Sequence, residues 1–237
     1  MANIAIILAG GQGTRMMNKI PKQFLVINDK PLIVHTLLKF AENNYIDGIA
    51  VVCLKDYKNH LEELIREYNI PKVKYIIDGG ANRHLSILNA LNFLDIEGFG
   101  CKDNVVIHNA NMPMVTEKNI NQCIEKCNCG IDIVSTAAKC SGFFYLNDNG
   151  VWKIGPDREI MFGAKPPEAL KFDVACNIYR NPKFQVKEYE SYTSGMLGIL
   201  NGNKVDIVLC ESTNIKVTTE DDYRLVSTYL SNEKHSI

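Results

Sequence analysis

The stretch ILAGGQGTRMMNKIPKQFL, residues 7–25, joins the end of a short apolar run to a glycine-rich turn. Gly10, Gly11 and Gly13 let the backbone turn tightly and bring its N–H groups close to an anion. Two interpretations follow, a phosphate-binding loop or a plain turn at the end of the first strand. The first strand itself is expected at Asn3–Leu8, where the residues are almost all apolar.

Two cations follow the glycines and favour the phosphate-binding interpretation. Arg15 can grip phosphate oxygens with two parallel hydrogen bonds, and Lys22 supplies a point charge. Two familiar phosphate motifs are excluded, because no GxxxxGK[ST] occurs and a GxGxxG would need glycine where the chain has Met16. A glycine-rich turn with two solvated cations remains the alternative.

Apolar strand patterns and amphipathic helix patterns alternate over the first 138 residues, which implies a largely parallel sheet covered by helices. Further strands are expected at Gly48–Leu54, Val73–Ile77, Val105–His108 and Ile131–Ala137, and helices at Pro31–Asn43, Tyr57–Tyr68, Arg83–Leu94 and Glu117–Cys127. We therefore predict an α/β fold with a Rossmann-like, mostly parallel sheet flanked by helices.

Three of the expected strand ends carry unusual residues, namely Gly10-Gly11, Gly79-Gly80 and Asn109. In parallel α/β sheets, ligands bind outside the carboxyl ends of the strands. The three strand ends should therefore converge on one edge of the sheet and form the binding site.

The alternation breaks at residues 139–163, where Asn149-Gly150 is typical of a β-hairpin turn. The aromatic residues of this segment, Trp152 among them, are too apolar to stay in water. We favour a protruding β-arm that packs against a second subunit, and a hairpin folded back on its own sheet is the alternative.

The α/β pattern resumes after the arm and completes one expected domain, residues 1–237. Strands are expected at Lys204–Leu209 and Asn214–Val217. Thr219 with Asp222 three residues later makes a capping box for a last helix that runs through Leu230.

The composition limits partners and compartment. A net charge of −1 argues against nucleic acid or an anionic membrane as partner, and no apolar run reaches the ~20 residues of a membrane helix. The N-terminus lacks the features of a signal peptide, and a reduced cytoplasmic protein is expected from the cysteines. Cys123, Cys127 and Cys129 could form a zinc site, but no CxxC or histidine pair supports one.

Four blocks of the chain resemble, in order, the cytidylyltransferases that make CDP-ribitol and CDP-methylerythritol. They are LAGGQGTRM…PKQFL…KPLIVHTL, DGGANRHLSILNAL, VVIHNANMPMV and NIKVTTEDD. The chain is most similar to the ribitol-5-phosphate branch. The resemblance implies a nucleotidyltransferase fold and transfer of CMP from CTP to a phosphorylated polyol, with release of pyrophosphate.

The resemblance also implies roles for individual residues. Arg15, Lys22 and Lys216 would surround the triphosphate as the catalytic cations, and Gly80 would bind the base. The nucleotide-binding set would be Ala9, Gly10, Gly11, Gly13, Gly80, Arg83 and Ser86, and the acceptor-binding set Asn109, Lys139, Arg158 and Thr193.

The chain departs from the family pattern at the metal and acceptor positions. Asn109 stands where the family has the aspartate that binds Mg²⁺, so it offers an oxygen without a charge. Met112, Lys139-Cys140 and Thr193-Ser194-Gly195 also differ from the family. Mg²⁺ would then be held mainly by the triphosphate, with Asn109 as a doubtful ligand.

Three interpretations stay open, of which we favour the first. In the first, the chain is an active cytidylyltransferase with CTP and a small phosphorylated acceptor as substrates. In the second, it is a nucleotide-binding relative with weak or no catalysis that acts as a regulatory or partner subunit. In the third, it is an α/β domain with a ligand-binding site and no transfer chemistry. Ribitol-5-phosphate is the nearest acceptor by analogy, and methylerythritol phosphate remains open. A cytoplasmic homodimer formed through the arm is expected.

Overall fold

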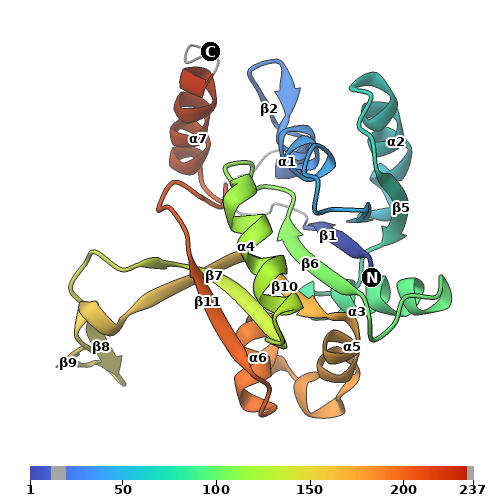
Figure 1. Ribbon diagram of the computed structural model, residues 1–237. Coiled ribbons are helices and arrows are strands. Elements are labelled where there is room, and N and C mark those ends of the chain that lie inside the picture. The colour runs from blue at the N-terminus through green and yellow to red at the C-terminus, as the bar shows by residue number, and fades with distance from the viewer. Residues whose placement is uncertain (12–19, 234–237) are drawn as a thin grey trace.

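The computed structural model describes residues 1–11 and 20–233, and its centre is one large sheet (Figure 1). In the described part of the chain this sheet has seven strands in the order β11-β7-β10-β6-β1-β4-β5. Their bounds are β1 Asn3–Ala9, β4 Gly48–Cys53, β5 Val73–Asp78, β6 Asn104–Asn109, β7 Ile133–Lys139, β10 Phe162–Lys171 and β11 Val205–Leu209. The strands predicted within the first 138 residues are all present.

The sheet is mostly parallel, as predicted. Strand β1 pairs in parallel with β4 and β6, β4 with β5, and β7 with β11. Strand β10 is the exception, because it runs antiparallel to both of its neighbours, β6 and β7. Local sequence patterns do not predict this strand, because Pro166 and Pro167 interrupt its alternation. In the structure, a register shift between Lys165 and Glu168 accommodates the two prolines.

Helices cover both faces of the sheet and bury its apolar side chains. One core cluster joins the sheet to α1 (Leu32–Ala41), α2 (Lys58–Glu67) and α4 (Glu117–Asn128). The other joins it to α3 (Arg83–Ile96), α5 (Phe172–Arg180) and α6 (Ser194–Leu200). The first four of these helices were predicted within a few residues, whereas α5 and α6 lie in a segment for which no prediction was made.

The last helix, α7 (Glu220–Glu233), forms a third apolar cluster with Ile27, Leu32 and Val217. Ile27 lies on the short strand β2 (Val26–Ile27), which pairs with β3 (Lys30–Pro31). The predicted capping box at its start is confirmed. The N–H of Asp222 donates to Thr219 Oγ1 over 3.2 Å, and the Asp222 carboxylate accepts from the N–H of Thr219 over 2.8 Å.

The predicted strand at 214–217 is wrong. This segment has no regular secondary structure and forms no ladder with the sheet. The Val217 N–H donates to the backbone oxygen of Asn111, beyond the end of β6, and Lys165 Nζ donates to the Asn214 carbonyl. One backbone contact and side-chain bonds replace a strand ladder there.

Residues 145–154 form a hairpin outside the large sheet. Strands β8 (Tyr145–Asp148) and β9 (Val151–Ile154) pair only with each other, and the hairpin projects from the body (Figure 1, lower left). Its side chains are exposed, with Trp152 at 68 %. The hairpin therefore does not fold back on its own sheet, which was the alternative weighed above.

Within residues 1–11 and 20–233, none of the helices combines the length and the apolar character needed to cross a bilayer.

Candidate active site

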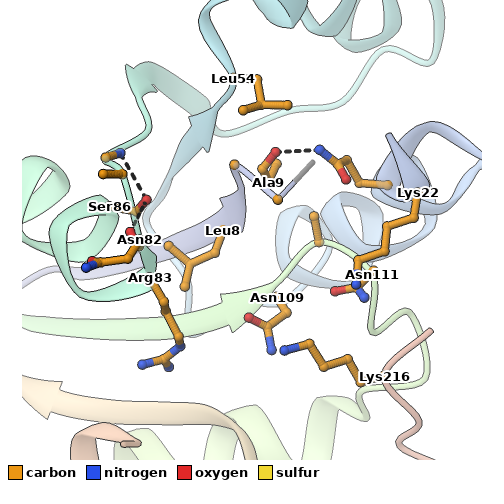
Figure 2. A pocket seen from close by; sticks show the side chains of 16 residues that line it. Leu8, Ala9, Lys22, Leu54, Asn82, Arg83, Ser86, Asn109, Asn111 and Lys216 are labelled. Carbon is orange, nitrogen blue, oxygen red and sulfur yellow. Dashed lines mark hydrogen bonds between the residues drawn. The ribbon is translucent and has the colours of Figure 1, made fainter. Parts of the chain in front are cut away.

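A pocket of about 510 Å³ opens at the carboxyl ends of the parallel strands (Figure 2). Its lining includes Gly10 and Gly11 after β1, Gly80 after β5 and Asn109 at the end of β6. The three strand ends that the sequence singled out therefore do converge on one edge of the sheet. The remaining lining residues are Leu8, Ala9, Lys22, Gln23, Leu54, Ala81, Asn82, Arg83, Ser86, Ala110, Asn111 and Lys216.

The two glycine turns pack closely against each other. A Cβ atom added to Gly10 would lie 3.8 Å from the Cα of Gly79. At Gly80 an added Cβ would come within 2.5 Å of the Cβ of Leu85, so only glycine fits there. The Gly80 N–H donates to Ser86 Oγ over 3.0 Å, and this bond ties the turn to the first turn of α3.

Asn82 begins α3 at the pocket wall. Its Oδ1 accepts a hydrogen bond from the N–H of Leu85 over 2.8 Å, which is the standard N-cap geometry. The hydroxyl of Ser86 donates to the Asn82 carbonyl over 2.8 Å. The helix start and the Gly80 turn are therefore one hydrogen-bonded unit.

Lys22 lies at the start of a short 3₁₀ turn, Lys22–Phe24, which is held against β1. The buried Gln23 side chain donates to the Ala9 carbonyl over 2.6 Å. This bond fixes the segment that carries Lys22 to the strand that carries Ala9. Both residues line the same pocket.

Lys216 reaches the pocket from the irregular segment before α7. Asn111 donates from its side chain to the Val217 carbonyl and accepts from the Val217 N–H over 3.0 Å. Lys165 Nζ donates to the Asn214 carbonyl over 2.9 Å. These bonds hold the segment in place without a strand ladder.

Arg83, the first residue of α3, supplies the third basic side chain of the lining. Its guanidinium donates to the buried carboxylate of Glu168 over 3.1 Å, while 26 % of the Arg83 side chain is exposed. In Figure 2, Lys22 and Lys216 enter from the right and Arg83 lies at the lower left. The basic side chains thus come from three different parts of the chain.

Basic groups dominate the charge of the pocket. Among its described lining residues are Lys22, Arg83 and Lys216, and no aspartate or glutamate. The N–H groups of Gly79 and Gly80 already donate to the Cys53 carbonyl and to Ser86 Oγ, so further backbone donors for an anion would come from the turn after β1. Such a lining suits a polyanion with several phosphate groups.

The residues present do not fit a metal ion held by the protein alone. Mg²⁺ prefers oxygen ligands, usually with a carboxylate among them. Asn109 supplies only a neutral amide, and its Nδ2 donates to Met112 Sδ over 3.4 Å. Across residues 1–11 and 20–233, no group of three or more His, Cys, Asp or Glu side chains could hold a metal.

The histidine beside Asn109 is structural. His108 is completely buried, and its Nε2 lies 2.9 Å from the Met112 carbonyl. Burial lowers the pKa of His108 to about 4. A neutral His108 that donates from Nε2 therefore holds the turn that follows Asn109.

Three of the predicted acceptor residues lie outside the pocket lining. Lys139 ends β7. Arg158, at the base of the arm, stacks over the Phe143 ring at 5.0 Å. Thr193 caps α6 and accepts from the N–H of Met196. Gly13 and Arg15 lie outside the described residues.

Sequence reasoning missed several pocket residues, among them Gln23, Asn82 and Asn111. Asn82 could have been found from its sequence, because it directly precedes the helix at Arg83 as an N-cap. Gln23 and Asn111 carry no such signal, since their partners, Ala9 and Val217, are known only from the fold.

The cysteine cluster has the character of core packing. Cys123 and Cys127 are buried on α4, and burial raises the pKa of both thiols, that of Cys127 to about 12. Cys129 is exposed. Thiols in this state are not the thiolates that zinc requires.

The sequence model of one family, described as "IspD: 2-C-methyl-D-erythritol 4-phosphate cytidylyltransferase", matches residues 3–232 of the chain. The match covers almost the whole chain and includes every described residue of the pocket.

Relatives with two different substrates in their names are similar to the chain over nearly their full length. A ribitol-5-phosphate cytidylyltransferase of Vibrio parahaemolyticus is 32 % identical, with 98 % of each chain covered. One of Lacticaseibacillus paracasei is 35 % identical, covering 95 % of this chain and 97 % of the relative. A 2-C-methyl-D-erythritol 4-phosphate cytidylyltransferase of Thermosipho melanesiensis is 32 % identical, covering 94 % and 96 %.

Solved structures share the fold. The 4-diphosphocytidyl-2C-methyl-D-erythritol synthase of Anaerococcus prevotii superposes with a TM-score of 0.81 at 23 % identity, over 97 % of this chain and 96 % of that one. The 2-C-methyl-D-erythritol 4-phosphate cytidylyltransferase of Francisella tularensis gives 0.79 at 24 % identity, over 98 % and 99 %.

Proposed function

The chain belongs to the IspD family of cytidylyltransferases, and from this premise we propose that it transfers CMP from CTP to a phosphorylated polyol of the ribitol-5-phosphate type. The observation that carries the proposal is the pocket lining, which brings Lys22, Arg83 and Lys216 to two glycine turns and has no aspartate or glutamate among its described residues. A triphosphate is the ligand that matches this density of positive charge.

In the proposed reaction, an oxygen of the acceptor phosphate attacks the α-phosphorus of CTP. The new P–O bond forms as the bond to the β-phosphate oxygen breaks, and pyrophosphate leaves with that electron pair. Lys22 and Lys216 neutralise the charge that grows on the phosphoryl oxygens. Positioning and charge neutralisation suffice, and no covalent intermediate with the protein is required.

The glycine turns would hold the nucleotide. Because Gly80 has no side chain, the base could approach its backbone closely. The hydrogen bond from the Gly80 N–H to Ser86 Oγ fixes the position of Gly80. Ala9, Gly10 and Gly11 would offer backbone N–H groups at the end of β1. Arg15 and Gly13 complete this set as predictions from the resemblance.

We propose that Mg²⁺ enters the site on the triphosphate. Asn109 adds at most one neutral oxygen, so the charge that holds the ion has to come from the nucleotide.

The arm supports the proposal of a homodimer. Its exposed apolar side chains would be covered by a second copy of the chain, and Arg158 would then meet the acceptor at a site shared by two subunits. The free cysteines agree with a reducing compartment such as the cytoplasm.

A second candidate function is nucleotide binding without transfer. The neutral Asn109 at the position of the family's aspartate favours it, because binding needs the cations but not a metal ligand on the protein. Turnover and CTP affinity separate the two candidates.

The test is pyrophosphate release with CTP, Mg²⁺ and a panel of acceptors that includes ribitol-5-phosphate and methylerythritol phosphate. We expect release with one acceptor and a loss of about 100-fold in Lys22→Ala, the cost of removing one donor to a developing charge. Lys187→Ala, an exposed lysine outside the pocket, is the control. CTP binding by calorimetry without release would favour the second candidate, and absence of both would refute the pocket assignment.

A further inference from the structure

A buried carboxylate lies behind the pocket wall and has no role in the function proposed so far. Glu168 is on β10, the reversed strand, and its side chain is 2 % exposed. In the sheet it stands opposite Ile107 of β6 and Ser135 of β7. A charged group at such a site is costly unless hydrogen bonds and an opposite charge compensate it.

The partners of Glu168 come from three other elements. Oε2 accepts from the Arg83 guanidinium over 3.1 Å and from the Ser194 hydroxyl over 3.0 Å. Oε1 accepts from the Ser135 hydroxyl over 3.0 Å and from the Gly195 N–H over 3.0 Å. Strand β7, helix α3 and the start of helix α6 are therefore bonded to one carboxylate.

On the pocket side, this network orients Arg83. One nitrogen of the guanidinium is used by Glu168, and part of the side chain stays exposed in the pocket lining. The Tyr179 hydroxyl lies 2.9 Å from Ser194 Oγ and closes the network from α5. The direction of Arg83 is thus set by buried groups and not by solvent.

On the other side, the network fixes the first turn of α6. Gly195 packs so closely that an added Cβ would lie 2.6 Å from Ser135 Oγ. Thr193, the N-cap residue of α6, is one of the predicted acceptor residues. Glu168 therefore joins the nucleotide pocket to a segment assigned to the acceptor.

We propose that Glu168 is a positioning residue that holds the Arg83 guanidinium in the pocket and sets its place relative to the start of α6. Arg83 would then bind the nucleotide from a fixed position, and CTP affinity would depend on a residue that CTP does not touch. The role of Glu168 depends on the proposed function in one respect, which is that the pocket binds a nucleoside triphosphate.

The carboxylate is matched to its surroundings because all of its described partners are donors. A glutamine would keep one acceptor oxygen, but its amide group would face donors and leave Arg83 without a counter-charge. Glu168→Gln is therefore nearly the same in shape and removes the orienting charge.

The test compares Glu168→Gln with Ser135→Ala, which removes one hydrogen bond to the same carboxylate without touching Arg83. In Glu168→Gln we expect KM for CTP to rise about tenfold, the factor for losing one charge-assisted hydrogen bond, with kcat at saturating CTP retained. Ser135→Ala should lower the melting temperature and leave KM unchanged. An equal rise of KM in both variants would refute the proposal.

A double-mutant cycle tests whether the effect passes through Arg83. In an Arg83→Met background, Glu168→Gln should add no further loss of CTP affinity by calorimetry. A fully additive loss would overturn the proposal and assign Glu168 to stability alone.

Crystal structures of the two variants test the positioning of Arg83 independently of CTP binding. A wild-type chain that binds no CTP would refute the proposed function but not this positioning role. The Arg83 guanidinium should leave its position in Glu168→Gln and keep it in Ser135→Ala. An unmoved guanidinium in Glu168→Gln would contradict the positioning role.

Discussion

Asn109 is the residue on which the chemistry of the pocket depends most. It ends β6, lies in the pocket lining and donates to Met112 Sδ, so the turn after it is held without a carboxylate. Buried His108 supports the same turn from the neighbouring position. The described lining residues of the pocket are therefore basic or neutral, and the proposed Mg²⁺ would have to enter with the triphosphate.

Asn109→Asp should lower the Mg²⁺ concentration needed for half-maximal pyrophosphate release by roughly an order of magnitude, because ligand charge sets the affinity for hard cations. Titration of activity with Mg²⁺ at fixed CTP measures the change. Asn201→Asp, an exposed site on the C-cap of α6, is the control for added charge. An unchanged Mg²⁺ requirement would show that residue 109 does not face the ion.

Among the elements, the start of α7 has the most direct connection to Lys216, one of the proposed catalytic side chains. Two residues separate Lys216 from Thr219, the capping residue, and the Asp222 carboxylate accepts from the N–H groups of both Thr218 and Thr219. Partial burial by itself raises the pKa of Asp222. The hydrogen bonds from the N–H groups of Thr219 and Thr218 lower the pKa by more, so its net shift is downward.

Asp222→Ala should lower the free energy of unfolding by about 1 kcal/mol at neutral pH, the usual value of a helix cap. A carboxylate whose pKa is lower in the folded than in the unfolded state stabilises the fold fully at pH values above its unfolded pKa of 3.8. This stabilisation is lost as the pH falls through the pKa of the folded state. The difference between wild type and variant should therefore shrink towards low pH in urea unfolding.

Asp221→Ala is the matched control, since Asp221 is exposed in the same first turn of α7. Equal losses in the two variants would mean that charge near the helix start, and not the capping bonds, is responsible.

For the whole molecule, the arm is the feature that a single chain leaves unexplained. Tyr145, Trp152 and Ile154 are exposed on a hairpin that pairs only with itself. A hairpin of this kind is marginal in water unless another surface covers it. The arm therefore predicts a second copy of the chain as its partner.

Trp152→Glu should convert a dimer into a monomer in sedimentation velocity, because the charge would lie inside the proposed interface. Circular dichroism should stay unchanged, since the side chain makes little contact within its own chain. Ile96→Glu, 84 % exposed at the end of α3, is the control and should remain dimeric. A monomeric wild type would refute dimerisation through the arm.

Local patterns were enough to predict the parallel strands and the meeting of Gly10, Gly80 and Asn109 at one edge. They could not predict β10, because two consecutive prolines argue against a central strand. The sheet accommodates Pro166 and Pro167 at the register shift between Lys165 and Glu168, which only the pairing with β7 reveals. The failed strand at 214–217 has a similar cause, since a short apolar run can be held by side chains such as Asn111 as well as by a ladder.

The chain's periodicity, glycines and motifs sufficed for the α/β class, the pocket edge, the loop that carries Lys22 and the capping box, because each depends on residues near in sequence or on the known polarity of parallel strands. Lys216 was assigned to the site only by the family resemblance. Long-range packing alone revealed the partners of Arg83, the roles of Gln23 and Asn111, and the buried Glu168. These contacts join residues 14 to 106 positions apart, and no local signal encodes which distant donor meets a buried acceptor.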